Sequence, residues 1–176
     1  MRSHRQRRVV AYLGQLLQGE GRALEPVADA VTPELLALFE DALSRAADQI
    51  RAATAGQSDP LDRLKVAIEL LFELSRPDPA AKRPLFTDFA PQLLISHPTE
   101  VRIAHAPLIV LFTELMDEAE QAGALRPGIN PRRIAAMTMQ TVMFTAQSSA
   151  PPDDDAVHPI TAEEVWGFCA HGFAVS

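Results

Sequence analysis

Apolar residues recur at intervals of three and four along nearly the whole chain, the spacing that places them on one face of an α-helix. No stretch of useful length alternates between apolar and polar residues, as a half-buried strand would. The sequence therefore predicts an all-α fold of eight to nine helices, without an internal repeat. Hydrophobic residues make up 47% of the 176 residues, which is enough for a buried core at this length.

Capping residues followed by proline mark the starts of several predicted helices. Thr32-Pro33, Asp59-Pro60 and Asn130-Pro131 each place a proline at a first helical position, where no backbone N–H is needed. Thr161 and Glu164 have the spacing of a capping box. We expect these four helices to end near residues 56, 75, 148 and 173. Further helices are expected at 5–18, 26–31, 85–95 and 100–122, the last one bent at Pro107 and ended at Gly123.

Several function classes are disfavoured by composition. A single cysteine excludes an intrachain disulfide framework and a thiolate zinc site, and no two histidines have the i, i+4 spacing of a helical metal site. We therefore expect no metal and no cofactor. No apolar run approaches the roughly 20 residues of a membrane span, and the start lacks an apolar signal core, so we expect a cytoplasmic protein without membrane contact. We find no nucleophile paired with a base and no glycine-rich phosphate loop, so an enzyme is not expected.

Positive charge is concentrated at the N-terminus of an acidic chain. The net charge is −7, yet the first 22 residues hold five arginines and one glutamate. An acidic body does not bind a polyanion over its whole surface, so any DNA contact is predicted at Arg5, Arg7 and Arg8. The alternative is a solvated, partly disordered start. We divide the chain into an N-terminal helical segment, 1–31, and a main domain, 32–176.

Two helices near the C-terminus are more apolar than one subunit requires. No residue from Ile134 to Ala150 is charged, and the last helix carries two adjacent apolar stripes. A helix that is apolar around its circumference is buried on several sides. The surplus surface predicts a homodimer in which the last two helices of each chain form a four-helix contact, the alternative being a monomer with both helices in its centre. The predicted interface side chains are Met139, Met143, Val165 and Phe168.

A small-molecule pocket is the second predicted site. His105 falls on the apolar stripe of the helix at 100–122, and Gln140 lies on an otherwise apolar helix. Each is either a core side chain with a satisfied hydrogen bond or a polar group that faces a cavity. Apolar walls with a few polar groups are typical of small-molecule sites, which indicates a largely apolar ligand. The predicted ligand-binding residues are Phe72, Phe86, Phe89, His105, Phe112, Gln140 and Phe144.

Three segments of the main domain resemble TetR-type transcriptional regulators. Gly123-Ala-Leu-Arg126-Pro127-Gly-Ile-Asn130-Pro131, followed by Ile134-Ala135-Ala136, is similar to a loop and the helix after it in that family. Ile160-Thr161-Ala-Glu-Glu164-Val-Trp-Gly-Phe168 resembles the family's last helix, and Asp59-Pro60-Leu61 resembles a mid-domain helix start. The resemblance spans about 32–173 and implies a ligand-binding and dimerisation domain whose last two helices form the dimer interface.

The N-terminal segment resembles the start of that family's DNA-binding domain. Arg8-Val9-Val10-Ala11-Tyr12-Leu13 is similar to its first helix and Val27-Ala28-Asp29-Ala30 to its second. A recognition helix should follow, but the sequence from Thr32 passes directly into the connecting-helix pattern and offers no basic group to the major groove. Three readings stay open: a reduced helix-turn-helix that binds DNA through its arginines, a ligand-binding protein that acts without DNA, or an N-terminal sequence altered by start or frame assignment.

The resemblance and the residue patterns together predict a TetR-like one-component transcriptional regulator. Its dimeric helical body would bind a small, largely apolar effector and change the geometry of its N-terminal ends. The alternative function is a stand-alone dimer that sequesters a ligand or binds another protein, without contacting DNA.

Overall fold

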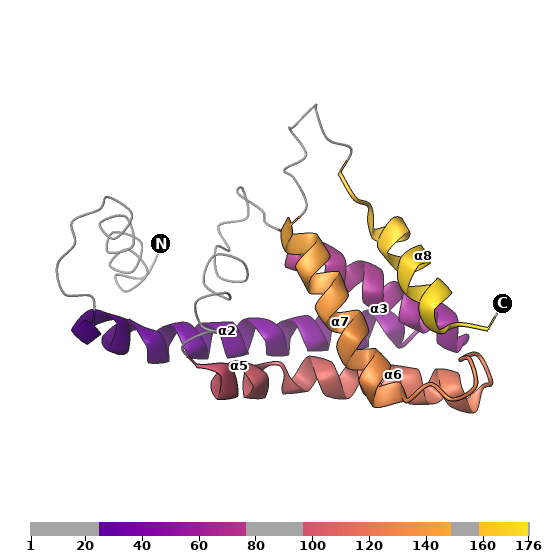
Figure 1. Ribbon diagram of the computed structural model, residues 1–176, viewed down its shortest axis with the longest axis horizontal. Helices are drawn as coiled ribbons and strands as arrows, with labels where there is room; N and C mark the ends of the chain where they lie inside the picture. Colours follow the sequence, from indigo (N-terminus) through magenta and orange to yellow (C-terminus); the bar gives the residue numbers. More distant parts are fainter. Residues whose placement is uncertain (1–24, 77–96, 149–158, 176) are drawn as a thin grey trace.

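A computed structural model describes residues 25–76, 97–148 and 159–175, with side chains from Leu36 onward. These residues form six helices (Figure 1), which confirms the predicted all-α class. The expected count of eight to nine is wrong, because the described residues contain only six helices. They are α2 (Glu25–Thr54), α3 (Pro60–Ser75), α5 (Pro98–Ala104), α6 (Ala106–Gln121), α7 (Pro131–Ser148) and α8 (Ala162–Phe173). The helices expected at 5–18 and 85–95 lie outside the described residues.

Two helix boundaries differ from the sequence-based expectation. Residues 26–31 and the segment from Thr32 belong to one helix of 30 residues, α2, whose first turn contains Pro26. Helical backbone therefore begins before Thr32, so Thr32 lies inside α2 and does not cap a helix start. Conversely, the helix expected at 100–122 is divided at His105 into α5 and α6. Pro107 has no N–H for the carbonyl of Ile103, four residues earlier, and its ring crowds that carbonyl, so the chain starts a new helix there.

The other predicted helix starts are confirmed by their hydrogen bonds. The carboxylate of Asp59 accepts the backbone N–H of Leu61 at 2.8 Å at the start of α3. The side chain of Asn130 accepts a backbone N–H three residues further along, at 3.0 Å. Thr161 and Glu164 form the capping box of α8, each side chain accepting the other residue's backbone N–H. These local signals fix where α3, α7 and α8 begin.

The loop after α6 pairs with the end of α8. Gly123 has a φ of 71°, a left-handed conformation that glycine adopts without strain, and it ends α6 as predicted. The backbone N–H of Arg126 then donates to the carbonyl of Phe173, and the N–H of Val175 donates to the carbonyl of Ala124, both at 2.9 Å. These two bonds hold the last described residues against the body of the domain.

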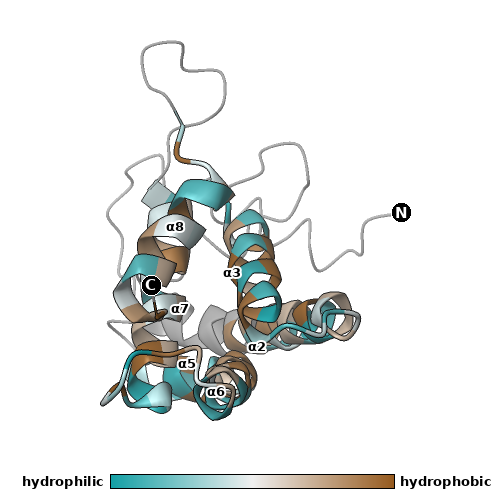
Figure 2. Ribbon diagram, turned by 90° about the vertical axis from the view of Figure 1, so that its right-hand side faces the viewer, coloured by the Kyte–Doolittle hydropathy of each residue, from teal (hydrophilic) through white to brown (hydrophobic). Residues whose placement is uncertain are grey.

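Helix α3 is the central helix, since it packs against α2, α6, α7 and α8. Figure 2 shows α7 and α8 together on one side of α3, with α2 toward the other side. The described core is built mainly from Leu, Ala and Phe, and its largest fully buried side chains include Phe39, Phe72, Phe112 and Phe173. Within the part of the chain that the structure describes, none of the helices has the length and apolar character needed to cross a membrane.

Candidate functional site

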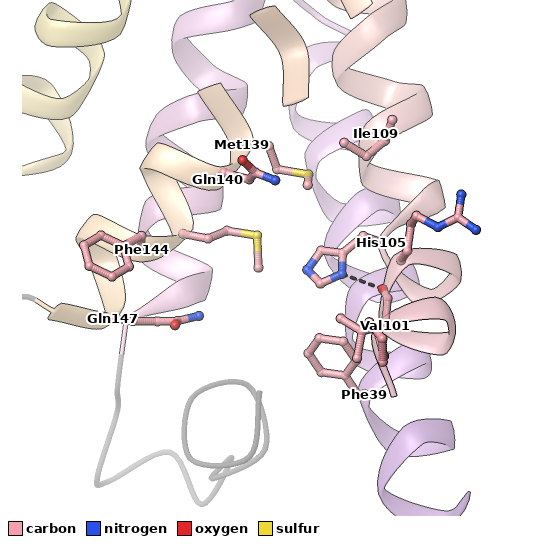
Figure 3. A pocket seen from close by; sticks show the side chains of 11 residues that line it. Phe39, Val101, His105, Ile109, Met139, Gln140, Phe144 and Gln147 are labelled. Atoms are coloured by element: carbon pink, nitrogen blue, oxygen red, sulfur yellow. Dashed lines mark hydrogen bonds between the residues drawn. The ribbon is translucent and has the colours of Figure 1, made fainter. Parts of the chain in front are cut away.

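A cavity of about 570 Å³ lies where α2, α5, α6 and α7 meet (Figure 3). Its walls are mostly apolar, and His105, the residue at the break between α5 and α6, lies beside it. Segments distant in the sequence contribute to it, from α2 to the end of α7. The lining residues are Phe39, Pro98, Val101, Arg102, His105, Ile109, Met139, Gln140, Met143, Phe144 and Gln147.

His105 is the polar group with the most defined geometry in this cavity. Its Nδ1 lies 2.7 Å from the carbonyl oxygen of Val101, four residues earlier on α5. The ring of Phe39 packs edge-on against the imidazole, with centroids 5.3 Å apart and an interplanar angle of 67°. Two independent contacts, one from α5 and one from α2, therefore fix the orientation of the ring.

The remaining polar lining groups are two amides and one guanidinium. Gln140 and Gln147 contribute neutral side chains from α7, and the side chain of Arg102 is exposed. None of the described lining residues is acidic. The described lining thus offers no carboxylate to a cationic ligand and a single exposed guanidinium to an anionic one. The cavity suits an uncharged or weakly polar molecule, because burying an unpaired charge among apolar side chains is costly.

Burial of the imidazole lowers the pKa of His105 below its usual value of 6.5, and the hydrogen bond to Val101 only partly opposes this shift. Loss of water around the ring disfavours the charged form, so the ring is neutral at pH 7. A neutral imidazole carries one ring proton and one acceptor nitrogen.

The lowered pKa of His105 predicts that stability falls on mild acidification. An unfolded histidine titrates near 6.5, whereas the folded pKa is lower, so between these values the unfolded state binds more protons. The free energy of unfolding should therefore decrease as the pH falls through this window. Urea unfolding at neutral pH and at about pH 5 measures the decrease, which should be smaller in His105→Phe. An identical pH dependence in the variant would contradict the assignment.

The predicted ligand-binding residues separate into three groups. His105, Gln140 and Phe144 line the cavity. Phe72 and Phe112 are fully buried in the core and do not line it. Phe86 and Phe89 lie outside the described residues, as do the arginines predicted to contact DNA, Arg5, Arg7 and Arg8.

The residues predicted for the dimer interface fall into two groups, three that are buried and one that is exposed. Met139 and Met143 are buried within one protomer and line the cavity, and Val165 is buried in the core. Phe168 is the exception, with 72% of its surface exposed. The first three are covered by their own chain because they share the inward faces of α7 and α8.

Other apolar side chains on α7 and α8 are exposed. Met137 and Phe144 on α7 are 62% and 72% exposed, and Phe168 is the exposed aromatic residue of α8. Both helices lie on the same side of α3, and they contact one another. We refer to Met137, Phe144 and Phe168 as the outer face. Phe144 belongs both to this outer face and to the cavity lining.

Of the residues that line the cavity, the sequence indicated only His105, Gln140 and Phe144 as ligand-binding. Phe39 lies on the apolar stripe of α2, where it is indistinguishable from a core residue, and Ile109 follows Pro107 without a polar neighbour that would mark a site. The described residues contain no group of three or more His, Cys, Asp or Glu side chains that could hold a metal ion.

Comparison with known proteins shows the fold. No protein-family model matches the sequence, and a search of curated proteins found no match. The structure is similar to that of the fatty acid degradation regulator FadR from Bacillus halodurans, with a TM-score of 0.58 and 23% identity over 78% of this chain and 71% of that one. It is also similar to apo AibR, with a TM-score of 0.55 and 17% identity over 80% of this chain and 72% of the other. This chain therefore has the helical fold of those two proteins.

Proposed function

We propose that this chain is a TetR-like, ligand-responsive transcriptional regulator whose helical body binds a small, largely apolar molecule. The observation that carries the proposal is the cavity of about 570 Å³ with apolar walls and an oriented neutral histidine. This size and lining are those of a small-molecule site. The fold supports the proposal, since FadR is described as a regulator of fatty acid degradation.

The lining chemistry supports binding rather than catalysis. Among the described lining residues, none has a hydroxyl, thiol or carboxylate that could act with His105 as a nucleophile or as a second acid–base group. We therefore propose that the cavity holds its ligand without transforming it.

The connection between cavity and N-terminus supports a regulatory role. Phe39 lines the cavity from α2, and α2 continues as one helix to Glu25, which the arginine-bearing segment precedes in the sequence. A bound molecule would thus contact the helix that leads to the proposed DNA-binding residues Arg5, Arg7 and Arg8. To act as an effector, it must bind one arrangement of α2 more tightly than another.

We propose a homodimer that forms through the outer face. A two-fold axis would place Met137, Phe144 and Phe168 of one copy against the same patch of the second copy. The outer face is an apolar patch without basic residues: α7 has no charged residue after Arg133, and the charged residues of α8, Glu163 and Glu164, are acidic. Such a patch suits a second apolar surface rather than a nucleic acid.

A substitution that fills the cavity tests the ligand-binding proposal. Ile109→Trp adds a bulky ring to the lining, whereas Val110→Trp adds the same ring at the next position, which is 51% exposed. With 1-decanol as the probe and titration calorimetry as the measurement, wild type and Val110→Trp should bind with similar affinity. Binding to Ile109→Trp should be weaker by about tenfold or more, because the apolar contact area is occupied. Equal binding by all three proteins would refute the site.

A gel mobility shift with DNA from upstream of the coding sequence separates this proposal from its alternative. A regulator should retard the DNA, and changing Arg5, Arg7 and Arg8 to Ala should abolish the shift. A protein that binds 1-decanol but never retards this DNA is instead a ligand-sequestering or protein-interaction dimer.

A further inference from the structure

The hydrogen bond of His105 determines which ring nitrogen carries the proton. A backbone carbonyl oxygen can only accept, so the 2.7 Å contact with Val101 requires that Nδ1 be the donor. In the neutral ring the other nitrogen, Nε2, then has a lone pair and no hydrogen. The backbone of α5 thereby makes Nε2 a hydrogen-bond acceptor.

The acceptor nitrogen faces the cavity. Figure 3 shows the imidazole of His105 projecting from its helix toward α7, with the nitrogen opposite the Val101 bond directed into the space between the two helices, on the side where Met139 lies. The edge contact with Phe39 prevents the ring from turning freely. A bound molecule would therefore meet a fixed lone pair within an otherwise apolar wall.

Building on the proposed function, we propose that this cavity selects apolar ligands that carry an uncharged hydrogen-bond donor, a hydroxyl or an amide N–H, which donates to Nε2 of His105. A carboxylate has no proton to donate and would place its own lone pairs against that of Nε2; the cationic group among the described lining residues, Arg102, has an exposed side chain. A ligand with only an ether or ester oxygen would leave the buried acceptor unpaired. His105 is thus a specificity-determining residue.

A second histidine provides a matched control. Nδ1 of His171 lies 2.6 Å from the carbonyl oxygen of Gly167, also four residues earlier, so its local geometry resembles that of His105. His171 is exposed on α8 and does not line the cavity. Substituting it changes the number of histidines and leaves the cavity intact.

The test compares 1-decanol with decyl methyl ether, two uncharged molecules that share a ten-carbon chain and differ in having a donor. Titration calorimetry on the full chain gives the ratio of their dissociation constants for each protein. Relative to His105→Phe, wild type should favour the alcohol by roughly three- to tenfold, the range for one neutral hydrogen bond. His105→Gln keeps an acceptor and should retain part of this preference, and His171→Gln should equal wild type.

The outcomes separate this inference from the proposed function. If the ratio of the two dissociation constants is the same in wild type and in His105→Phe, the proposed selection for a donor is wrong, but the cavity remains a ligand site. A preference that is lost equally in His171→Gln would also overturn it. If neither probe binds wild type, the proposed ligand site itself fails. Thermal melting of each variant confirms that the compared proteins are folded.

Discussion

Phe168→Glu is expected to convert the proposed dimer into a monomer with the mass of one chain, 19.2 kDa. The Phe168 side chain is 72% exposed in a single protomer, and together with Met137 and Phe144 it forms the outer face. A carboxylate in an apolar interface must lose its water without gaining a partner. We expect association to weaken by about 2–4 kcal/mol, or roughly thirty- to thousandfold. Sedimentation velocity over a range of micromolar concentrations measures the change.

The control for this variant is Val110→Glu. Val110 is 51% exposed, so the substitution adds the same charge at an exposed apolar position of α6 and leaves the residues of α7 and α8 unchanged. Val110→Glu should sediment as wild type does. If Phe168→Glu also sediments as wild type, or if wild type is already monomeric, the outer face does not mediate self-association.

Phe112→Ala is expected to lower the free energy of unfolding by about 3–5 kcal/mol, a large part of the total stability of a domain. The ring is fully buried in α6 and does not line the cavity, so its removal leaves a void in the core. Urea unfolding at neutral pH measures the loss. Affinity for 1-decanol, measured where the variant is still folded, should change little because the cavity lining is intact.

The corresponding control is Val110→Ala on the same helix. With half of its surface exposed, Val110 loses few contacts on truncation, and we expect a change within about 1 kcal/mol. A cost at Phe112 no larger than that at Val110 would contradict the core assignment. If Phe112→Ala instead binds 1-decanol more weakly and keeps its stability, Phe112 is a ligand-binding residue, as the sequence analysis predicted.

Local signals in the sequence were enough to predict the class of fold and several helix starts. The carboxylate of Asp59 and the capping box of Thr161 and Glu164 act within four residues of themselves, so their effect is independent of tertiary packing. The helix count required more than this. Whether Thr32-Pro33 starts a helix or lies inside one depends on the residues before it, and whether Pro107 bends a helix or ends it depends on how the two segments pack.

The inward side of α7 could not be predicted from hydropathy. A charged stripe normally marks the solvent side of a helix, and α7 has no charged residue after Arg133. Met139 and Phe144 therefore look equally suited to the core, the cavity or a subunit contact. The structure places Met139 inside with 3% exposure, whereas Phe144 is 72% exposed. Contacts with α3 and α6 decide between them, and these helices are distant in the sequence.

The cavity was predicted only in part for a related reason. Phe72 and Phe112 have the same periodic spacing as aromatic residues that line a pocket, yet they fill the core. Sequence pattern distinguishes buried from exposed positions but does not reveal where packing leaves a space. His105 and Gln140 were identifiable because a polar side chain on an apolar stripe requires a partner.

In the proposed dimer, the placement of Phe144 would couple ligand binding to subunit association. This side chain lines the cavity and is also exposed on the outer face, so a second subunit docked there would complete the wall around a bound molecule. Ligand uptake and subunit pairing would then be thermodynamically linked, each strengthening the other by the same factor. The ligand's dissociation constant should consequently be larger when it is measured with dilute protein than with concentrated protein. Titrations should therefore be compared only at matched protein concentrations.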